Sequence, residues 1–301
     1  MRPETSGGAV AIAAALFVVA ASGASAQAPD LVKRGEYLFR AGICYSCHTD
    51  EKACGKPLAG GLALVSPFGT FYSPNITPDP ETGIGRWSDA DFARAMRLGI
   101  RPDGAHYFQA FPYTTYTKMS DEDVAALKAY LFAQPPVHQP NRAHDIPPPF
   151  SWRFLQAGWK LLFFAPGPFK PDPAKSAEIN RGAYLVEALA HCGECHTPRN
   201  PLGGLDRAKW LAGTPDGPEG ERAPNITPDK DTGAGSWSAV DLIEAMKTGT
   251  KPDYDNLQGT MYAAIAHGLK YLTEDDLKAI AAYLKDVPAI ANKVPARKPK
   301  G

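Results

Sequence analysis

A five-residue pattern, Cys-x-x-Cys-His, occurs at residues 44–48 and again at 192–196, and it constrains the fold more than any other feature of the chain. Two intervening residues let one helical turn present both sulfurs to the two vinyl groups of a porphyrin, and the histidine that follows reaches the iron. A dithiol redox pair or half of a zinc site also uses Cys-x-x-Cys, but neither requires a histidine after both copies. The pattern therefore predicts two covalently bound haem c groups. The predicted thioether residues are Cys44, Cys47, Cys192 and Cys195, and the predicted proximal ligands are His48 and His196.

The sequence around the two patterns repeats in phase with them. Matching segments are 33–38 with 180–185, 74–79 with 224–229, 87–88 with 237–238, and 95–96 with 245–246. A chain of 301 residues is long enough for two domains of ordinary size. We therefore expect two copies of one unit of about 120 to 150 residues. Asn75 and Asn225 match a glycosylation sequon, but their equivalent places beside prolines indicate a structural turn near each haem.

Each unit is expected to consist of helices joined by long loops. In each unit a first helix is predicted over 31–41 or 177–190, and a middle helix between Ser88 and Gly99 or between Ser238 and Gly249. A last helix is predicted to begin at 120–123 or 273–276 and to end near 134 or 287. Gly35 and Gly182 have no Cβ and should let the first helix approach a last helix that carries Tyr130 or Tyr283. Because long loops rich in proline and glycine do not fill a core, haem should fill it. The expected fold is all-α, with two tandem domains.

The two ends of the chain differ from its globular part. Arg2, an apolar run over 9–21 and the string Ala24-Ser25-Ala26 predict an export signal, cleaved before about Gln27. An uncleaved anchor is the alternative, although the run is short for a membrane span. The predicted boundaries are 1–26 for the signal peptide, 27–134 for domain one, 135–175 for a linker, 176–290 for domain two and 291–301 for a basic, disordered tail. Cys54 is expected to be an unpaired thiol without a role, or else to form an intermolecular bridge.

The linker has two parts. Six prolines stiffen its first part, 135–149. Its second part, 150–169, is rich in large apolar residues, but it is too short for a membrane span and contains charged residues. This part is expected either to pack between the domains or to dock on a membrane surface or a partner subunit. The formal net charge of zero gives no overall attraction to nucleic acid.

The distal ligands decide what each haem can do. An electron-transfer haem usually fills both axial positions, and methionine opposite histidine raises its potential. In unit two, Met261 lies ahead of the last helix and is the predicted distal ligand. In unit one the candidates are, in order, Met119, His106, and Tyr113 or an open site. Met96 and Met246 occupy matching positions in the middle helices and are expected to be core residues.

The strings Arg-Gly-x-Tyr-Leu, Cys-x-x-Cys-His-Thr, Pro-Asn-Ile-Thr-Pro-Asp and Gly-x-Gly-x-Trp-Ser resemble those of bacterial diheme cytochromes c of the class I type, with two repeated domains. They are also similar to the cytochrome subunits of membrane-associated alcohol, gluconate and aldehyde dehydrogenases. The resemblance covers nearly the whole mature chain. The alcohol dehydrogenase subunits carry three haem domains and commonly a Met-Pro-Tyr string that supplies the first distal ligand. This chain has two domains and reads Phe111-Pro112-Tyr113, and phenylalanine cannot bind iron.

The resemblance implies a periplasmic protein, near the inner membrane, that carries single electrons from a periplasmic or membrane-associated dehydrogenase to the respiratory chain. A cytochrome, a quinone or an oxidase would be the acceptor, and no residue is assigned a catalytic role. The alternative is a diheme redox enzyme of the peroxidase or thiosulfate-oxidising type, which needs one haem with an open or displaceable axial site.

Overall fold

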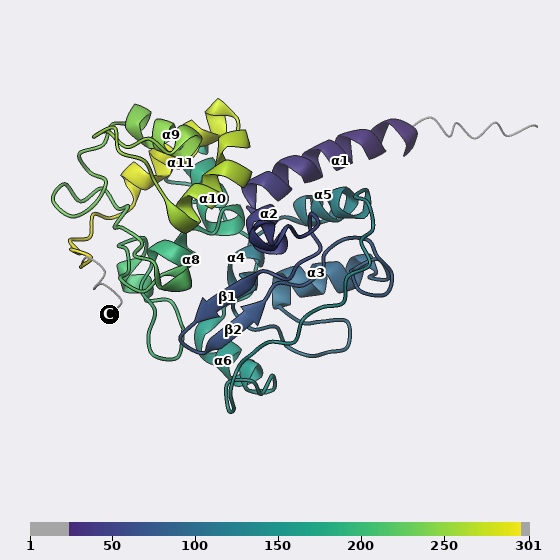
Figure 1. The fold of residues 1–301 in the computed structure, drawn as a ribbon. Helices are drawn as coiled ribbons and strands as arrows, with labels where there is room; N and C mark the ends of the chain where they lie inside the picture. Colours follow the sequence, from purple (N-terminus) through teal and green to yellow (C-terminus); the bar gives the residue numbers. More distant parts are fainter. Residues whose placement is uncertain (1–23, 296–301) are drawn as a thin grey trace, which may run out of the picture.

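The computed structural model describes residues 24–295, so most of the predicted signal peptide and the end of the predicted tail lie outside it. Unit one contains α1 (Ala24–Ala41), α2 (Cys44–His48), η1 (Glu51–Ala53), β1 (Ala63–Ser66), β2 (Gly69–Tyr72), α3 (Asp89–Leu98), α4 (Tyr113–Tyr116) and α5 (Asp121–Phe132). The linker contains α6 (Leu155–Phe163). Unit two contains α7 (Ala177–Tyr184), the π-helical η2 (Leu185–Leu189), α8 (Cys192–His196), η3 (Arg207–Lys209), η4 (Pro218–Gly220), α9 (Ala239–Thr248), α10 (Gly259–His267), η5 (Leu269–Tyr271) and α11 (Glu274–Asp286). The two units lie side by side (Figure 1).

Local capping residues fix the helix boundaries. Before α3, the Ser88 hydroxyl accepts a hydrogen bond from the Asp91 amide, and the Asp91 carboxylate accepts one from the Ser88 amide. The helix ends at Gly99, whose φ of 59° lies in the left-handed region that favours glycine. The same roles belong to Ser238, Asp241 and Gly249 in α9, while Ser120 and Thr273 cap α5 and α11. These predicted caps are confirmed.

The first and last helices of each unit cross at a glycine. A Cβ on Gly35 would lie 2.0 Å from a backbone oxygen of α5, and one on Gly182 would lie 1.9 Å from a backbone oxygen of α11. The Cβ atoms of Tyr130 and Tyr283 would be 2.7 and 2.8 Å away. Real Cβ atoms do not approach other atoms so closely, so only glycine permits these crossings. The predicted close approach is confirmed in both units.

A reciprocal set of polar contacts joins the two units and explains the repeated Arg-Gly-x-Tyr string. Arg34 of α1 donates to the buried carboxylate of Asp123 in α5, with 2.8 Å between Nε and Oδ1. Tyr184 of unit two reaches across and donates its hydroxyl to the same carboxylate. The matching set, with the units exchanged, is Arg181, Asp276 and Tyr37. Each unit therefore supplies one tyrosine to an ion pair of the other.

The two Asn-Ile-Thr strings form buried turns. Asn75 and Asn225 are 2% and 4% exposed, which leaves no access for a glycan. The Asn75 side chain donates to the Val137 carbonyl at 2.7 Å, and the Asn225 side chain donates to the Ile290 carbonyl at 2.7 Å. In both units, therefore, the chain beyond the last helix returns over this turn. The predicted structural turn is confirmed.

The beginning of the predicted tail is packed rather than disordered. The Asn292 side chain donates to the Ala212 carbonyl at 2.8 Å, and Val294 is buried. Residues 291–295 continue the segment that covers the Asn225 turn, so the prediction of disorder is wrong for them. The sequence prediction failed here because this segment is held by contacts with residues of unit two that are far away in the sequence.

The linker folds back on unit one and then contacts both units. A backbone bridge joins Thr70 of β2 to Asp145, and β1 pairs antiparallel with β2, a hairpin that adds two short strands to the otherwise helical fold. In α6, the Lys160 ammonium donates to the Gly99 carbonyl of unit one at 2.9 Å, and the Trp159 indole donates to the Leu202 carbonyl of unit two at 2.9 Å. The linker thus packs between the units through one face of α6.

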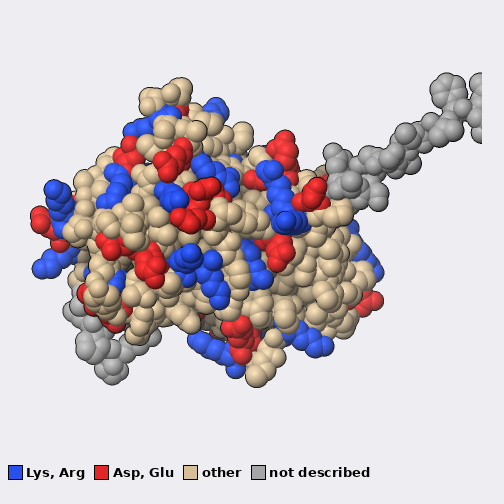
Figure 2. Space-filling model, turned by 90° about the horizontal axis from the view of Figure 1, so that it is seen from above, with Lys and Arg blue, Asp and Glu red and all other residues tan. Residues whose placement is uncertain are grey.

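The visible surface mixes charges of both signs. Figure 2 shows basic and acidic side chains interspersed on this face, without a continuous patch of one sign. Within residues 24–295, no helix combines the length and the apolar character that crossing a membrane would require.

Candidate haem sites

Both Cys-x-x-Cys-His strings form the same local structure. Each is a five-residue helix, α2 or α8, that follows a residue with positive φ, Ile43 at 54° or His191 at 42°. Each helix ends at an extended threonine, Thr49 or Thr197. The hydroxyl of this threonine accepts a hydrogen bond from a backbone amide 9 residues further on in unit one and 14 residues further on in unit two. The two attachment strings are therefore held in equivalent geometry.

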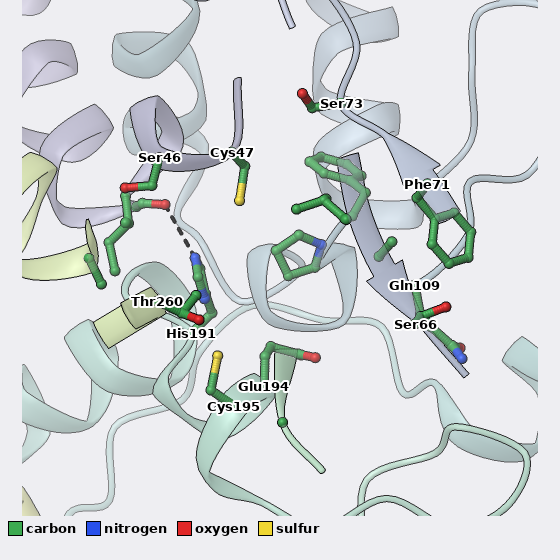
Figure 3. A pocket seen from close by; sticks show the side chains of 18 of the residues that line it. Ser46, Cys47, Ser66, Phe71, Ser73, Gln109, His191, Glu194, Cys195 and Thr260 are labelled. Atoms are coloured by element: carbon green, nitrogen blue, oxygen red, sulfur yellow. Dashed lines mark hydrogen bonds between the residues drawn. The ribbon is translucent and has the colours of Figure 1, made fainter. Parts of the chain in front are cut away.

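The two strings open into one large, mainly apolar cavity. Its volume is about 1940 Å³, and its lining includes Cys44, Cys47, His48, Cys192, Cys195 and His196. Figure 3 shows Cys47 and Cys195 pointing into the same space from opposite sides. A cavity of this size and apolar character, with paired thiols at its wall, fits two porphyrins attached through sulfur.

Both predicted proximal histidines are oriented in the same way. The Nδ1 atom of His48 lies 2.8 Å from the Pro74 carbonyl oxygen, and Nδ1 of His196 lies 2.8 Å from that of Pro224. Because a carbonyl only accepts hydrogen bonds, Nδ1 carries the proton and Nε2 keeps its lone pair. Burial lowers the pKa of both imidazoles, which favours the neutral form that binds iron. The buried Asn75 and Asn225 turns directly follow these prolines and fix their carbonyls.

The alternative roles of the cysteines fit the site poorly. Burial raises the pKa of Cys47 to about 11 and that of Cys44, Cys192 and Cys195 to about 12. A redox dithiol needs an accessible thiolate, which this environment disfavours. Among the described residues, no cluster of three or more His, Cys, Asp or Glu side chains is arranged to hold a metal ion. Cys54, outside both strings, is exposed.

The methionines are placed differently from one another. Met261 of α10 lines the cavity, as do Met96 and Met246 of the middle helices. Met119 does not line the cavity, because it is fully buried beside the start of α5. The Met119 carbonyl accepts a hydrogen bond from Arg97 at 2.8 Å. The structure therefore brings Met261 to the haem cavity and leaves Met119 in the protein core.

The other two candidates in unit one also lie away from the cavity wall. The His106 Nδ1 atom lies 2.9 Å from the Lys160 ammonium, within the contact between α6 and unit one. Tyr113 is fully buried, packs edge-on against Phe164, and its hydroxyl has no partner among the described residues. Tyr107 and Phe111 do line the cavity here, although the sequence prediction did not single them out as ligands.

Two further residues connect the attachment strings across the units. The His191 ring nitrogen Nε2 lies 3.3 Å from the Gly42 carbonyl oxygen of unit one (Figure 3). The Glu194 carboxylate accepts hydrogen bonds from the Thr114 and Thr115 hydroxyls at 2.9 and 3.0 Å. Burial acts to raise the pKa of Glu194, but the charge of Arg199 and hydrogen bonds from Thr114 and Arg199 outweigh it, so the pKa is lowered. The sequence does not predict these contacts, because Gly42, Thr114 and Thr115 belong to the other unit.

The fold and the site together define a c-type haem protein with two attachment sites on one chain. Comparison with known families gives the same result, since the Cytochrome c family pattern matches residues 32–133 and 179–288. The chain belongs to the cytochrome c family and carries two covalently bound haem c groups. The predictions of fold class, resemblance and cofactor are confirmed.

Three relatives illustrate the range of this family. A diheme cytochrome c-type protein of Cereibacter sphaeroides is 48% identical over 261 residues, which cover 85% of this chain and 86% of the relative. The fructose dehydrogenase cytochrome subunit of Gluconobacter japonicus is 45% identical over 270 residues, or 89% of this chain and 54% of the relative. The gluconate 2-dehydrogenase cytochrome c subunit of Pantoea cypripedii is 43% identical over 273 residues, or 87% and 61%. The chain thus spans most of the first relative and little more than half of the two dehydrogenase subunits.

Proposed function

We propose that this chain accepts single electrons from a dehydrogenase and passes them to the respiratory chain. The observation that carries the proposal is the shared cavity, into which both attachment strings open. Two similar relatives are named as cytochrome subunits of dehydrogenases, which supports a dehydrogenase as donor. When bound, each haem supplies an iron that cycles between the ferric and ferrous states.

We assign the protein ligands as follows. Cys44, Cys47, Cys192 and Cys195 hold the porphyrins by thioether bonds, and His48 and His196 are the proximal ligands. Met261 is the distal ligand of unit two, because it comes from α10 and lines the cavity. The apolar walls exclude water from the site and favour a raised potential. The carbonyls of Pro74 and Pro224 hold the proton on Nδ1 and so keep the proximal ligands in position.

The two haem sites form an internal relay. Contacts made by Glu194 and His191 fix the attachment string of unit two against unit one. The reciprocal tyrosine contacts also join the two units. Because both contact sets are short and partly buried, the two sites are held at a constant separation.

We propose that the exposed face of α6 docks on the dehydrogenase subunit. The side chains of Leu161, Leu162 and Phe154 are 89%, 70% and 68% exposed, which is unusual for residues of this size. Leu162 also lines the cavity, so this apolar surface is continuous with the haem sites. A subunit that covered it would therefore bring its own electron donor close to a haem. Docking on a membrane surface is the alternative that the test must separate.

The test mixes the purified, oxidised protein with membranes from cells that lack this chain, and follows the reduction of its haems. Fructose, gluconate or ethanol is added in turn, and haem reduction is read in the visible spectrum. We expect one substrate to drive reduction, and a Leu161→Lys/Leu162→Lys variant to be reduced at least tenfold more slowly. Val240→Lys is the matched control, because Val240 is 73% exposed on α9, away from α6 (Figure 1). An equally slow reduction of the control variant would contradict docking on the dehydrogenase. So would a double variant that loses only its binding to protein-free lipid vesicles and is still reduced at the native rate.

We further propose that the chain works in the periplasm. The N-terminal apolar run has the pattern of an export signal, and covalent haem attachment in bacteria takes place outside the cytoplasm. Cell fractionation and the intact mass of the purified protein test this proposal. We expect a periplasmic protein whose mature chain begins near Gln27. A haem-loaded chain in the cytoplasmic fraction would contradict the proposed location.

A further inference from the structure

In each unit a loop connects the middle helix to the distal side of the haem cavity, and the two loops follow the same register. The loop begins at the helix-capping Gly99 in unit one and at Gly249 in unit two. In both units a backbone bridge follows, from residue 100 to 106 and from residue 250 to 256. The next amide then donates to the glycine carbonyl, from Tyr107 at 2.8 Å and from Leu257 at 2.7 Å. The two loops are therefore equivalent up to Tyr107 and Leu257. Beyond them, Met261 lies within α10, whereas Phe111 precedes α4.

This register places Phe111 where unit two has Met261. Each of the two residues follows its capping glycine by twelve positions, 99 to 111 and 249 to 261. Both side chains line the haem cavity. Met261 brings a sulfur to that position, whereas Phe111 brings a hydrocarbon ring that cannot bind iron. Unit one thus differs from unit two at the residue that we assign as the distal ligand.

No other methionine takes over this place in unit one. Met119 precedes the cap of the last helix, and its counterpart in unit two is Leu272, which is also buried. Met96 lies three residues before Gly99, just as Met246 lies three residues before Gly249. Since unit two has Met246 in addition to Met261, the middle-helix methionine belongs to the core of both units. Met96 lines the cavity as Met246 does, and on this comparison unit one has no counterpart of the Met261 sulfur.

The surroundings of Phe111 favour an unligated distal side. Its ring packs edge-on against Tyr107, with 5.3 Å between centroids, and lies tilted against Tyr116, with 5.7 Å between centroids. The Tyr116 hydroxyl is engaged, because it donates to the Gly42 carbonyl at 3.2 Å. Tyr107 lines the cavity, and burial raises the pKa of its hydroxyl to about 12. At neutral pH this phenol therefore stays protonated and can donate a hydrogen bond.

We propose that the haem of unit one has no protein ligand on its distal side and accepts a small diatomic ligand there, beside Phe111 and Tyr107. The haem of unit two is closed by Met261. The inference rests on the proposed proximal attachment of both haems, but not on the identity of the electron donor. Two sites of unequal ligation on one chain would differ in potential, since methionine ligation raises the potential of the second.

The first experiment titrates the reduced native protein with carbon monoxide and counts bound ligand per chain from the visible spectrum. We expect one carbon monoxide per chain, and one strongly shifted methionine methyl resonance in the proton NMR spectrum of the reduced protein. Intact mass after denaturation is measured on the same sample. A chain that carries both haems but binds no carbon monoxide would overturn the proposal. A chain with fewer than two haems would overturn the attachment sites instead, so the two failures are distinguishable.

Two mirrored variants then test the register directly. Phe111→Met should supply the missing sulfur, abolish carbon monoxide binding and add a second shifted methionine resonance. Met261→Phe should do the opposite, raising carbon monoxide binding to two per chain and removing the native resonance. Met96→Leu and Met119→Leu are the controls, and both should leave the stoichiometry and the resonance of the native protein unchanged. New carbon monoxide binding in either control variant would identify its methionine as a ligand and contradict the proposal. Should Phe111→Met not fold, Met261→Phe and the native titration decide the question.

Discussion

Replacing Gly182 with alanine tests the packing that shapes each unit. A Cβ at this position would lie 1.9 Å from the backbone oxygen of Ala279, where ordinary contact begins at about 3.4 Å. A backbone oxygen in the middle of α11 cannot rotate away, so the two helices must separate. Overpacking of this kind costs about 3 kcal/mol, and the better helix propensity of alanine offsets about 1 kcal/mol. We expect a net loss of about 2 kcal/mol.

The assay is thermal unfolding of the haem-loaded protein, followed by far-ultraviolet circular dichroism. At about 2 to 4 °C per kcal/mol, the midpoint of Gly182→Ala should fall by about 4 to 8 °C. Gly35→Ala should behave alike, since its Cβ would meet a backbone oxygen at 2.0 Å. Gly158→Ala in α6 is the matched control, because a Cβ there meets nothing within 4 Å, and it should gain about 0.5 to 1 kcal/mol. If Gly182→Ala stabilised the protein as much as the control, the helix crossing described here would be refuted.

Three further predictions concern the interface and the turns. Tyr37→Phe removes the hydroxyl that bridges to Asp276 and should cost about 1 kcal/mol in thermal or denaturant unfolding, whereas no loss would show that this contact is not formed. Burial acts to raise the pKa of Asp276, but hydrogen bonds from Arg181 and Tyr37 outweigh it and hold the pKa below its ordinary value. The stability that the ionised carboxylate contributes is complete above the ordinary pKa and is lost as the pH falls through the lowered one. Asp276→Asn should therefore flatten the acid branch of a plot of melting temperature against pH, and an unchanged branch would contradict this assignment. Asn225→Ala should lower the free energy of unfolding by about 1 to 3 kcal/mol, because it leaves buried hydrogen-bonding groups unpaired. It should also broaden the visible absorption bands of one haem only, the haem of unit two.

Features encoded by neighbouring residues could be predicted from the sequence. The attachment strings combine their ligands within five residues, so Cys44 and His48 needed no knowledge of the fold. Helix boundaries followed from capping chemistry that acts over three or four residues, as at Ser88 and Gly99. The repeat added information that a single unit lacks, because a glycine at the same place twice indicated the tight helix crossings.

Features that depend on distant contacts could not be predicted. Tyr37 and Tyr184 were visible in the repeat, but their partners belong to the opposite unit, and nothing local indicates this exchange. The same holds for Glu194 inside the second attachment string. Met119 was favoured as a ligand because it precedes the last helix, as Met261 does. Unit one is three residues shorter there, and only the shared loop register shows that Phe111 occupies the equivalent place.

The central claim is that this polypeptide binds two haems through sulfur, and the intact mass of the denatured chain tests it most directly. The chain should be produced in a host that matures c-type cytochromes and measured after complete unfolding, when only covalent bonds retain the porphyrin. We expect the mass of the mature chain plus two haem groups. Replacing Cys44 and Cys47 by alanine, or Cys192 and Cys195, should remove one haem in each case. A native chain that showed its polypeptide mass alone, or kept both haems without either cysteine pair, would contradict the account.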